Sequence, residues 1–234
     1  MTARAQKGLV WWGASFLLIY GFAWALLIKT VPPIPANWTT DQVAQFYREN
    51  GTSIRIGALI TSWTAGFMVP IAVVIAVQMA RLEKGVPIWA ILQFAGGIMM
   101  SILLVLPPLF WGVTAWEPSR PAEVTKALHD LSWLTMTTTD QYYIFQMVAM
   151  VVISLRRTEV PFSAFPRWYG YFTAWCAVMF EAGALAFAFR TGPFAWHGLF
   201  VFWSPLILFG TWVFLTCYWL LRVIEQQRKA GLCE

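Results

Sequence analysis

Two acidic side chains lie inside long apolar stretches of the sequence. Glu181 stands between Phe180 and Ala182, and Asp140 follows the three threonines 137–139. An acidic side chain in hydrocarbon costs about 2.5–3.5 kcal/mol on insertion scales, so such residues usually face the interior of a helix bundle and serve a function. The two positions predict a polar pocket. The plainer alternative is that each acid is only hydrogen-bonded to a neighbouring helix.

Three prolines fall at a similar depth to the two acids. Pro107 and Pro108 lie near the end of one apolar stretch, and Pro205 lies near the start of another. A proline within a helix kinks it and leaves a carbonyl without its N–H partner. At membrane depth such a carbonyl needs a cavity or a neighbouring donor. We therefore expect Pro107, Pro108 and Pro205 to line an outward-facing pocket together with Glu181 and Asp140.

The two histidines are the other candidates for chemistry. His129, with Asp130 beside it, and His197 both fall near the predicted outer ends of helices. A bis-histidine haem held by His129 and His197 is conceivable chemically, but no cofactor is predicted. A catalytic zinc site uses three protein ligands, and no histidine–cysteine spacing suggests one, so no metal is predicted. There is no GxSxG motif or P-loop, and the catalytic residues remain unassigned.

The composition predicts a membrane protein. Of the 234 residues, 59% are hydrophobic and only 12% are charged, whereas about a quarter of a soluble domain is charged. Eight of the 15 tryptophans fall near the ends of apolar stretches, where they would anchor helices at the membrane interface: Trp11, Trp12, Trp63, Trp89, Trp111, Trp116, Trp168 and Trp196. The formal charge of +5 is spread over many short segments, which favours a role in topology over nucleic-acid binding.

Six apolar stretches are long enough to cross a bilayer, which takes about 20 residues each. They are 9–28, 56–80, 87–113, 135–155, 168–189 and 197–221. Strand alternation is absent, so the sequence predicts one all-α domain over residues 1–234, a polytopic transmembrane helix bundle. The first stretch exceeds the 7–15 residues of a signal-peptide core, so we expect it to be retained as a span.

The distribution of basic residues predicts the orientation. With the N-terminus in the cytoplasm, ten of the 16 lysines and arginines fall in inside segments and six fall outside. Short inside loops are enriched in these residues, so both termini should be cytoplasmic.

Two outside loops are long enough to contain helices of their own. In the first, Thr39 and Gln42 have the spacing of a capping box, and Val43, Phe46 and Tyr47 share a helical face. We expect a short amphipathic helix over 40–50 that lies on the membrane. The second loop, 117–134, should form a helix that runs into the fourth span.

Several short motifs resemble those of a family of bacterial six-span integral membrane proteins that has no established function. They are Phe165-Pro166-Arg167-Trp168 with Gly170-Tyr171, Thr191-Gly192-Pro193-Phe194-Ala195-Trp196 with Gly198, Pro32-Pro33, and Gln78-Met79. The resemblance extends over most of the chain and implies a bacterial inner-membrane protein, but it implies no activity. This sequence has His197 where the family would have asparagine, and Glu181 where it would have an apolar residue or proline.

Three functions remain open. The first is a binder or carrier of a small lipophilic or cationic molecule that uses the outward pocket. The second is a non-catalytic subunit of a larger membrane complex. The third is a membrane enzyme that uses carboxylate and histidine acid–base chemistry. The expected partners are the bilayer, the small ligand, and further copies of this chain or other membrane subunits.

Overall fold

All regular elements in the described part of the chain are helical. The computed structural model describes residues 2–156 and 160–233. In chain order the elements are α1 (Ala3–Phe22), η1 (Ala23–Leu27), α2 (Thr40–Thr64), η2 (Ala65–Phe67), α3 (Met68–Ala80), α4 (Ile88–Trp116), α5 (Ala122–Thr138), η3 (Asp140–Tyr143), α6 (Ile144–Leu155), α7 (Arg167–Phe180), η4 (Glu181–Phe187), η5 (Leu199–Trp203) and α8 (Ser204–Lys229). The segments η1 and η5 are π-helical, and η2, η3 and η4 are 3-10 helical. The predicted all-α class is confirmed.

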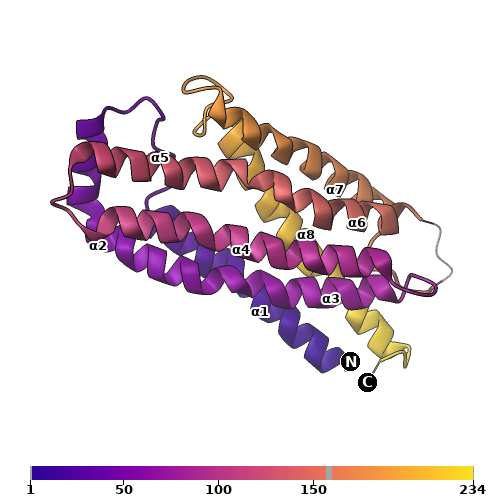
Figure 1. The fold of residues 1–234 in the computed structure, drawn as a ribbon. Helices are drawn as coiled ribbons and strands as arrows, with labels where there is room; N and C mark the ends of the chain where they lie inside the picture. The colour runs from indigo at the N-terminus through magenta and orange to yellow at the C-terminus, as the bar shows by residue number, and fades with distance from the viewer. Residues whose placement is uncertain (1, 157–159, 234) are drawn as a thin grey trace.

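The helices form a bundle of long, roughly aligned rods (Figure 1). Several rods are composite, because a short η segment continues the helix before it: η1 extends α1, η2 joins α2 to α3, and η4 extends α7. Both chain termini lie at one end of the bundle, which we call the terminal end (Figure 1). The loops 28–39, 117–121 and 188–198 lie toward the opposite end, which we call the distal end.

Five of these rods are long and apolar enough to cross a membrane. They are Ala3–Leu27, Thr40–Ala80, Ile88–Trp116, Arg167–Phe187 and Leu199–Lys229. The predicted fourth span, 135–155, is interrupted, because α5 ends at Thr138 and α6 begins only at Ile144. The hydroxyls of Thr138 and Thr139 donate to the carbonyls one turn earlier in α5. Such back-bonding favours bending of a helix.

The stretch 40–50 is not a separate helix on the membrane surface. The predicted capping box is present, with Thr39 Oγ1 and Gln42 Oε1 each accepting from the other residue's backbone N–H. The helical rod that begins there continues to Ala80, however, with the 3-10 segment η2 between α2 and α3. At about 1.5 Å per residue it is about 60 Å long, roughly twice the hydrocarbon thickness, so its first turns project beyond the apolar layer.

The apolar face predicted for this stretch is correct, but it packs against protein. Val43 and Tyr47 are buried and Phe46 is half-buried. The Tyr47 ring meets His129 of α5 edge-on, at 5.7 Å between ring centroids. The second loop also forms a helix, α5, and the chain runs from it towards α6 as expected. The first turns of α5 carry Lys126 and Asp130 and precede the apolar stretch.

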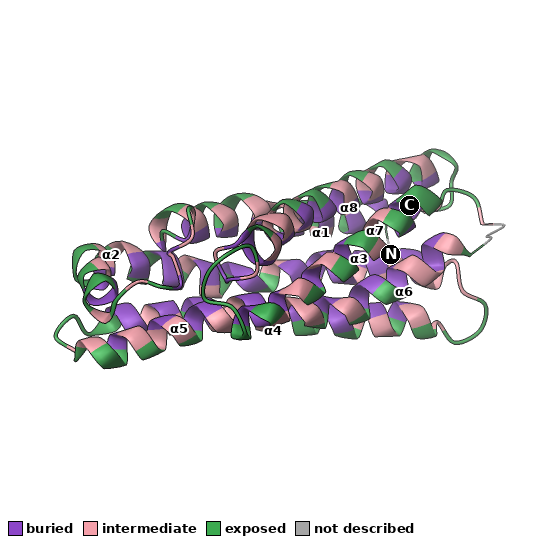
Figure 2. Cartoon of the chain, turned by 90° about the horizontal axis from the view of Figure 1, so that it is seen from above, coloured by how far each residue is buried: buried purple, intermediate pink, exposed green. Residues whose placement is uncertain are grey.

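The outward surface of the bundle suits a lipid environment. Figure 2 shows buried residues on the inward faces of the helices and exposed residues on the outward faces. Leu18, Trp63 and Phe187 are 76%, 78% and 71% exposed, which a monomer in water would not tolerate at this density. The architecture is consistent with a multi-pass membrane protein.

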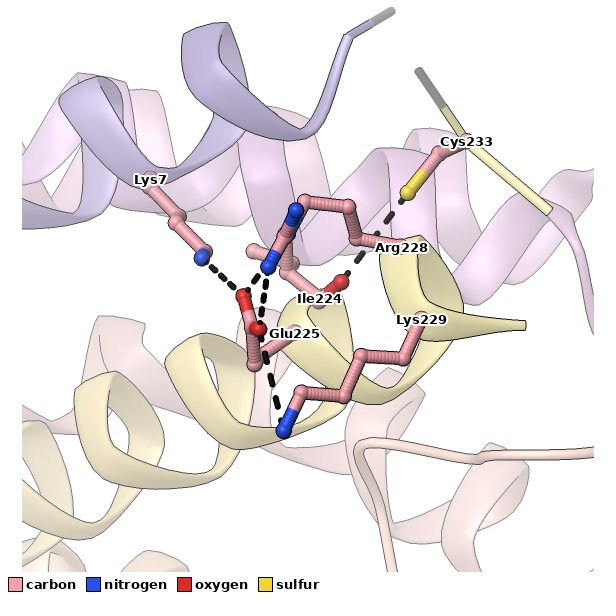
Figure 3. Close-up of polar contacts among 6 residues, drawn as sticks. All are labelled: Lys7, Ile224, Glu225, Arg228, Lys229 and Cys233. Carbon is pink, nitrogen blue, oxygen red and sulfur yellow. Dashed lines mark hydrogen bonds and ion pairs between the residues drawn. The ribbon is translucent and has the colours of Figure 1, made fainter. Parts of the chain in front are cut away.

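At the terminal end, one carboxylate fastens α1 to α8. The Glu225 carboxylate of α8 forms ion pairs with Lys7 of α1 and with Arg228, the latter at 2.7 Å between Oε1 and Nη2, and Lys229 lies 4.0 Å away (Figure 3). Beneath this contact, the buried Gln78 amide of α3 donates to Gln6 Oε1 at 2.7 Å and to Gln227 Oε1 at 3.1 Å. Three helices are therefore joined at this end.

Candidate functional site

A cavity of about 290 Å³ lies inside the bundle, between α1, α4, η3, α7 and α8. Of the residues predicted to form a pocket, the cavity lining contains Asp140, Pro107 and Pro205. Seven aromatic side chains surround these residues: Phe16, Tyr20, Trp24, Tyr143, Phe180, Phe202 and Phe209. The cavity is therefore largely apolar, with a small number of polar groups, as ligand sites in proteins commonly are.

Asp140 begins the 3-10 segment η3 at the break between α5 and α6. Its carboxylate makes no hydrogen bond or ion pair with any residue in the described part of the chain. The break is held by a close approach of η4, where a Cβ on Gly183 would lie 2.1 Å from the Thr137 carbonyl oxygen and 3.7 Å from Asp140 Cβ. Glycine at position 183 thus lets the Thr137–Asp140 segment face the cavity.

The hydroxyls near Asp140 donate their protons to backbone carbonyls of α5. Thr137 Oγ1 donates to the Trp133 carbonyl at 3.0 Å, and Thr139 Oγ1 donates to the Thr135 carbonyl at 2.8 Å. Each hydroxyl has a single proton, so what remains available to a ligand is its oxygen lone pairs. Both threonines line the cavity. Together with the carboxylate, they make this wall of the cavity rich in acceptors.

The prolines contribute further acceptors. Pro107 and Pro108 lie inside α4 and cannot donate to the carbonyls of Leu103 and Leu104. The Tyr20 hydroxyl donates to the Leu104 carbonyl at 3.0 Å. Leu103 also lines the cavity, but no side chain of the described residues donates to its carbonyl. Pro108 is buried without contributing to the lining, so only Pro107 of this pair lies where the sequence predicted.

Glu181 does not reach the cavity, and the expectation that it faces the bundle interior is wrong. Its side chain is exposed. The reason is helical geometry: Phe180 lines the cavity, and the next residue along a helix points about 100° away. The inward face of α7 and η4 instead runs through Cys176, Phe180 and Gly183, all of which are buried.

His129 belongs to a separate aromatic cluster at the distal end. Its Nδ1 lies 3.0 Å from the Tyr47 hydroxyl, and its ring centroid lies 6.0 Å from that of Trp196. Burial, with a smaller contribution from the Lys126 ammonium, lowers the pKa of the His129 imidazole to about 3. The ring is therefore neutral at physiological pH. Asp130 lies outside the cavity and pairs with Lys126 on the surface of α5.

His197 has a structural contact of its own. Its Nδ1 accepts a hydrogen bond from the Ala36 backbone N–H at 3.1 Å, which ties the loop 188–198 to the loop 28–39. Neither histidine lines the cavity. Within the described residues, no group of three or more histidine, cysteine, aspartate or glutamate side chains is placed to hold a metal ion.

Comparison with known protein families, with curated proteins and with solved structures finds no match to this chain. The resemblance noted from the sequence remains a prediction. The segment that carries part of that resemblance has a clear structural role. A Cβ on Gly198 would lie 2.4 Å from the Pro193 carbonyl oxygen, so this tight loop requires glycine there.

The aromatic residues that dominate the cavity were not among the predicted site residues. Phe16, Tyr20 and Trp24 of α1 and η1 all line it. Their spacing of four residues is a signal that could have identified them, because residues four apart lie on one face of a helix. Trp11 and Trp12 of this stretch were interpreted as interfacial anchors, and both are exposed, whereas no role was predicted for Trp24, which is buried.

Proposed function

We propose that this chain binds, or carries, a small organic cation with an apolar body in the Asp140 cavity. The observation that supports the proposal best is the charge of the lining. Among the described residues that form it, Asp140 is the one acidic residue, and there is no lysine, arginine or histidine. A carboxylate without a protein partner in an apolar cavity favours a ligand that brings a positive charge.

The aromatic lining supports the same class of ligand. Aromatic faces attract cations, and cages of such rings are used to recognise quaternary ammonium groups. Tyr143 stacks on Phe209 at 5.5 Å between ring centroids, and Phe180 meets Tyr143 edge-on at 5.5 Å. These rings form one side of the cavity and offer apolar contact as well as their electron-rich faces.

The size of the cavity limits the ligand. At about 290 Å³ it is roughly twice the ~150 Å³ of a cavity that accommodates benzene. A ligand of about 10–15 non-hydrogen atoms would therefore fill it. Benzyltrimethylammonium and its ring-substituted derivatives fall in this range and combine a permanent charge with an aromatic body.

Neither alternative function gains specific support. Acid–base catalysis would be favoured by an acid within hydrogen-bond reach of His129, but the hydrogen-bond partner of this histidine is the Tyr47 hydroxyl. A subunit role would be favoured by a flat stripe of small residues and tryptophan against another chain, whereas large side chains such as Leu18 and Phe187 also cover the exposed faces.

The proposal is tested with purified protein in lipid nanodiscs. 4-Bromobenzyltrimethylammonium is titrated while tryptophan fluorescence is recorded, because bromine quenches indoles and Trp24 lines the cavity. The wild type should show saturable quenching. Asp140→Asn should bind about tenfold to a hundredfold more weakly, since it loses the charge interaction.

Glu181→Gln is the matched control, because it makes the same chemical change on an exposed carboxylate. Its affinity should remain within about twofold of the wild type. A second comparison uses the neutral isostere of the probe, in which carbon replaces the ammonium nitrogen. Equal binding by Asp140→Asn and wild type, or equal affinity for the neutral and charged probes, would refute the proposal.

We also propose that the protein lies in a bacterial inner membrane with both termini in the cytoplasm. The support is that the terminal end carries Lys7, Arg228 and Lys229 around a single Glu225 (Figure 3). Gln45→Cys should then react with impermeant thiol reagents from outside the cell, and Val160→Cys only after permeabilisation. The reverse pattern would contradict the orientation.

A further inference from the structure

We infer that the ligand reaches the Asp140 cavity sideways from the bilayer, through a portal between α1 and α8 that is framed by Gly21 and Gly210. This inference rests on the proposed function, because it concerns the access route of the same ligand. It assigns a position-specific role to two glycines, and it restricts the ligand to molecules that partition into a membrane.

Gly21 and Gly210 form the open part of the cavity wall. Both residues line the cavity and both are partly exposed, so they connect its interior with the surface. A Cβ added to either glycine would meet no neighbouring side chain or other helix within 4 Å. Leu17 and Leu206 lie one helical turn from the two glycines, and both are half-buried in the same wall.

The portal lies at the depth of the hydrocarbon. Residues 8–28, around Gly21, and residues 199–221, around Gly210, contain no charged side chain. The neighbours that point outward beside the portal are large and apolar, with Leu18 76% exposed and Ile207 64% exposed. An opening in this setting faces acyl chains and not water.

The distal side of the cavity is closed by stacked rings. Trp24 stacks on Phe202 at 5.8 Å between ring centroids, and Trp133 packs against Phe202 at 5.9 Å. Trp196 stacks on Trp133 at 6.2 Å, and its indole N–H donates to the Ile34 carbonyl at 2.8 Å. The loop 28–39 is thereby fastened over the rings, which separates the cavity from the aqueous phase beyond them.

The terminal side is closed in the same way. Phe16 of α1 meets Phe209 of α8 edge-on at 6.2 Å, and Phe209 stacks on Tyr143. Between these aromatic contacts, Gly21 and Gly210 are the two residues of the described lining that carry no side chain, so the wall between α1 and α8 is thinnest beside them.

The test uses substitutions that obstruct the portal without disturbing the packing. Gly21→Leu and Gly210→Leu place a side chain where the structure has open space, so folding should be retained. Gly8→Leu and Gly66→Leu are matched controls, because these exposed glycines also have no atom within 4 Å of an added Cβ and do not line the cavity. Association and dissociation of 4-bromobenzyltrimethylammonium are measured by stopped-flow fluorescence in nanodiscs.

Both portal variants should slow association and dissociation together, by about tenfold, with an affinity close to that of the wild type. The control variants should keep wild-type rates. Leu206→Ala, which widens the seam, should accelerate association, and this variant keeps the test valid if a leucine at position 21 or 210 prevents folding.

Wild-type association rates in the portal variants, or a loss of affinity that comes from faster dissociation alone, would overturn the inference. So would an unchanged rate in Leu206→Ala. The proposed function fails differently: the wild type would then show no saturable quenching, or Asp140→Asn would bind as the wild type does. Binding that depends on Asp140 but not on the portal glycines would leave the proposed function in place and remove the portal.

Discussion

The Tyr20 hydroxyl of α1 donates a 3.0 Å hydrogen bond to the carbonyl of Leu104 in α4, which is the carbonyl that Pro108 leaves without its helical N–H partner. A carbonyl that lacks its donor in one helix thus accepts a hydrogen bond from a side chain of another. Because the two helices share the cavity, this bond also fixes the position of the Tyr20 ring in the lining.

Tyr20→Phe should lower the free energy of unfolding by about 1–2 kcal/mol, because it leaves the Leu104 carbonyl without a donor. The measurement is thermal or denaturant unfolding of the purified protein. In a Pro108→Ala background the backbone can supply the missing N–H, so the same substitution should cost less. An equal cost in both backgrounds would show that the two residues are not coupled.

Gly183→Ala should be strongly destabilising, by about 2 kcal/mol or more. The added Cβ would lie 2.1 Å from the Thr137 carbonyl oxygen, so η4 must move away from the break that positions Asp140. Gly8→Ala is the control, since open space surrounds that position. We expect Gly183→Ala to weaken binding of the cationic probe as well, whereas unchanged stability would contradict the close approach.

His129 should make stability depend on pH. Its pKa of about 3 in the folded protein lies below the usual 6.5, so between these values the unfolded chain binds more protons. The contribution of the neutral His129 ring to the free energy of unfolding is complete above about pH 6.5. It is lost as the pH falls towards 3, by at most ~1.4 kcal/mol per pH unit. His129→Gln should show a shallower decline in unfolding free energy between pH 7 and 5, and parallel profiles would contradict the prediction.

Gln93→Met should leave stability unchanged or increase it by about 1 kcal/mol. The Gln93 side chain is fully buried in α4, and neither its amide nitrogen nor its oxygen has a hydrogen-bond partner among the described residues. Replacing a buried unpaired amide by an apolar group of similar shape removes a desolvation cost. A clear drop in melting temperature would show that the amide has a partner, such as a bound water molecule, that the substitution removes.

The sequence was a good guide to the helices and to some of the site, for physical reasons. A membrane span is recognised from the mean hydropathy of about 20 consecutive residues, which does not depend on how each side chain packs. The spans around Gly21, Pro70 and Pro107 could therefore be predicted. Asp140, Pro107 and Pro205 were found because each is exceptional inside an apolar helix. Which way a residue faces depends on its neighbours, and Glu181 was misplaced because its stretch is apolar on every face. The 40–50 helix was assigned to the membrane because its actual partner, α5, lies about 80 residues further along the chain.

The ion pair at the terminal end places a fixed point between α1 and α8, from which the effect of a change in their crossing angle can be derived. Lys7 and Glu225 hold the two helices together there, while the portal lies fourteen residues further along α1, at Gly21, which is about 21 Å of helix. A rotation of about 5° around the fastened end would shift Gly21 by about 2 Å, with the Lys7–Glu225 contact almost stationary. A small change in the angle between α1 and α8 at the ion pair therefore produces a larger change in their separation at the portal.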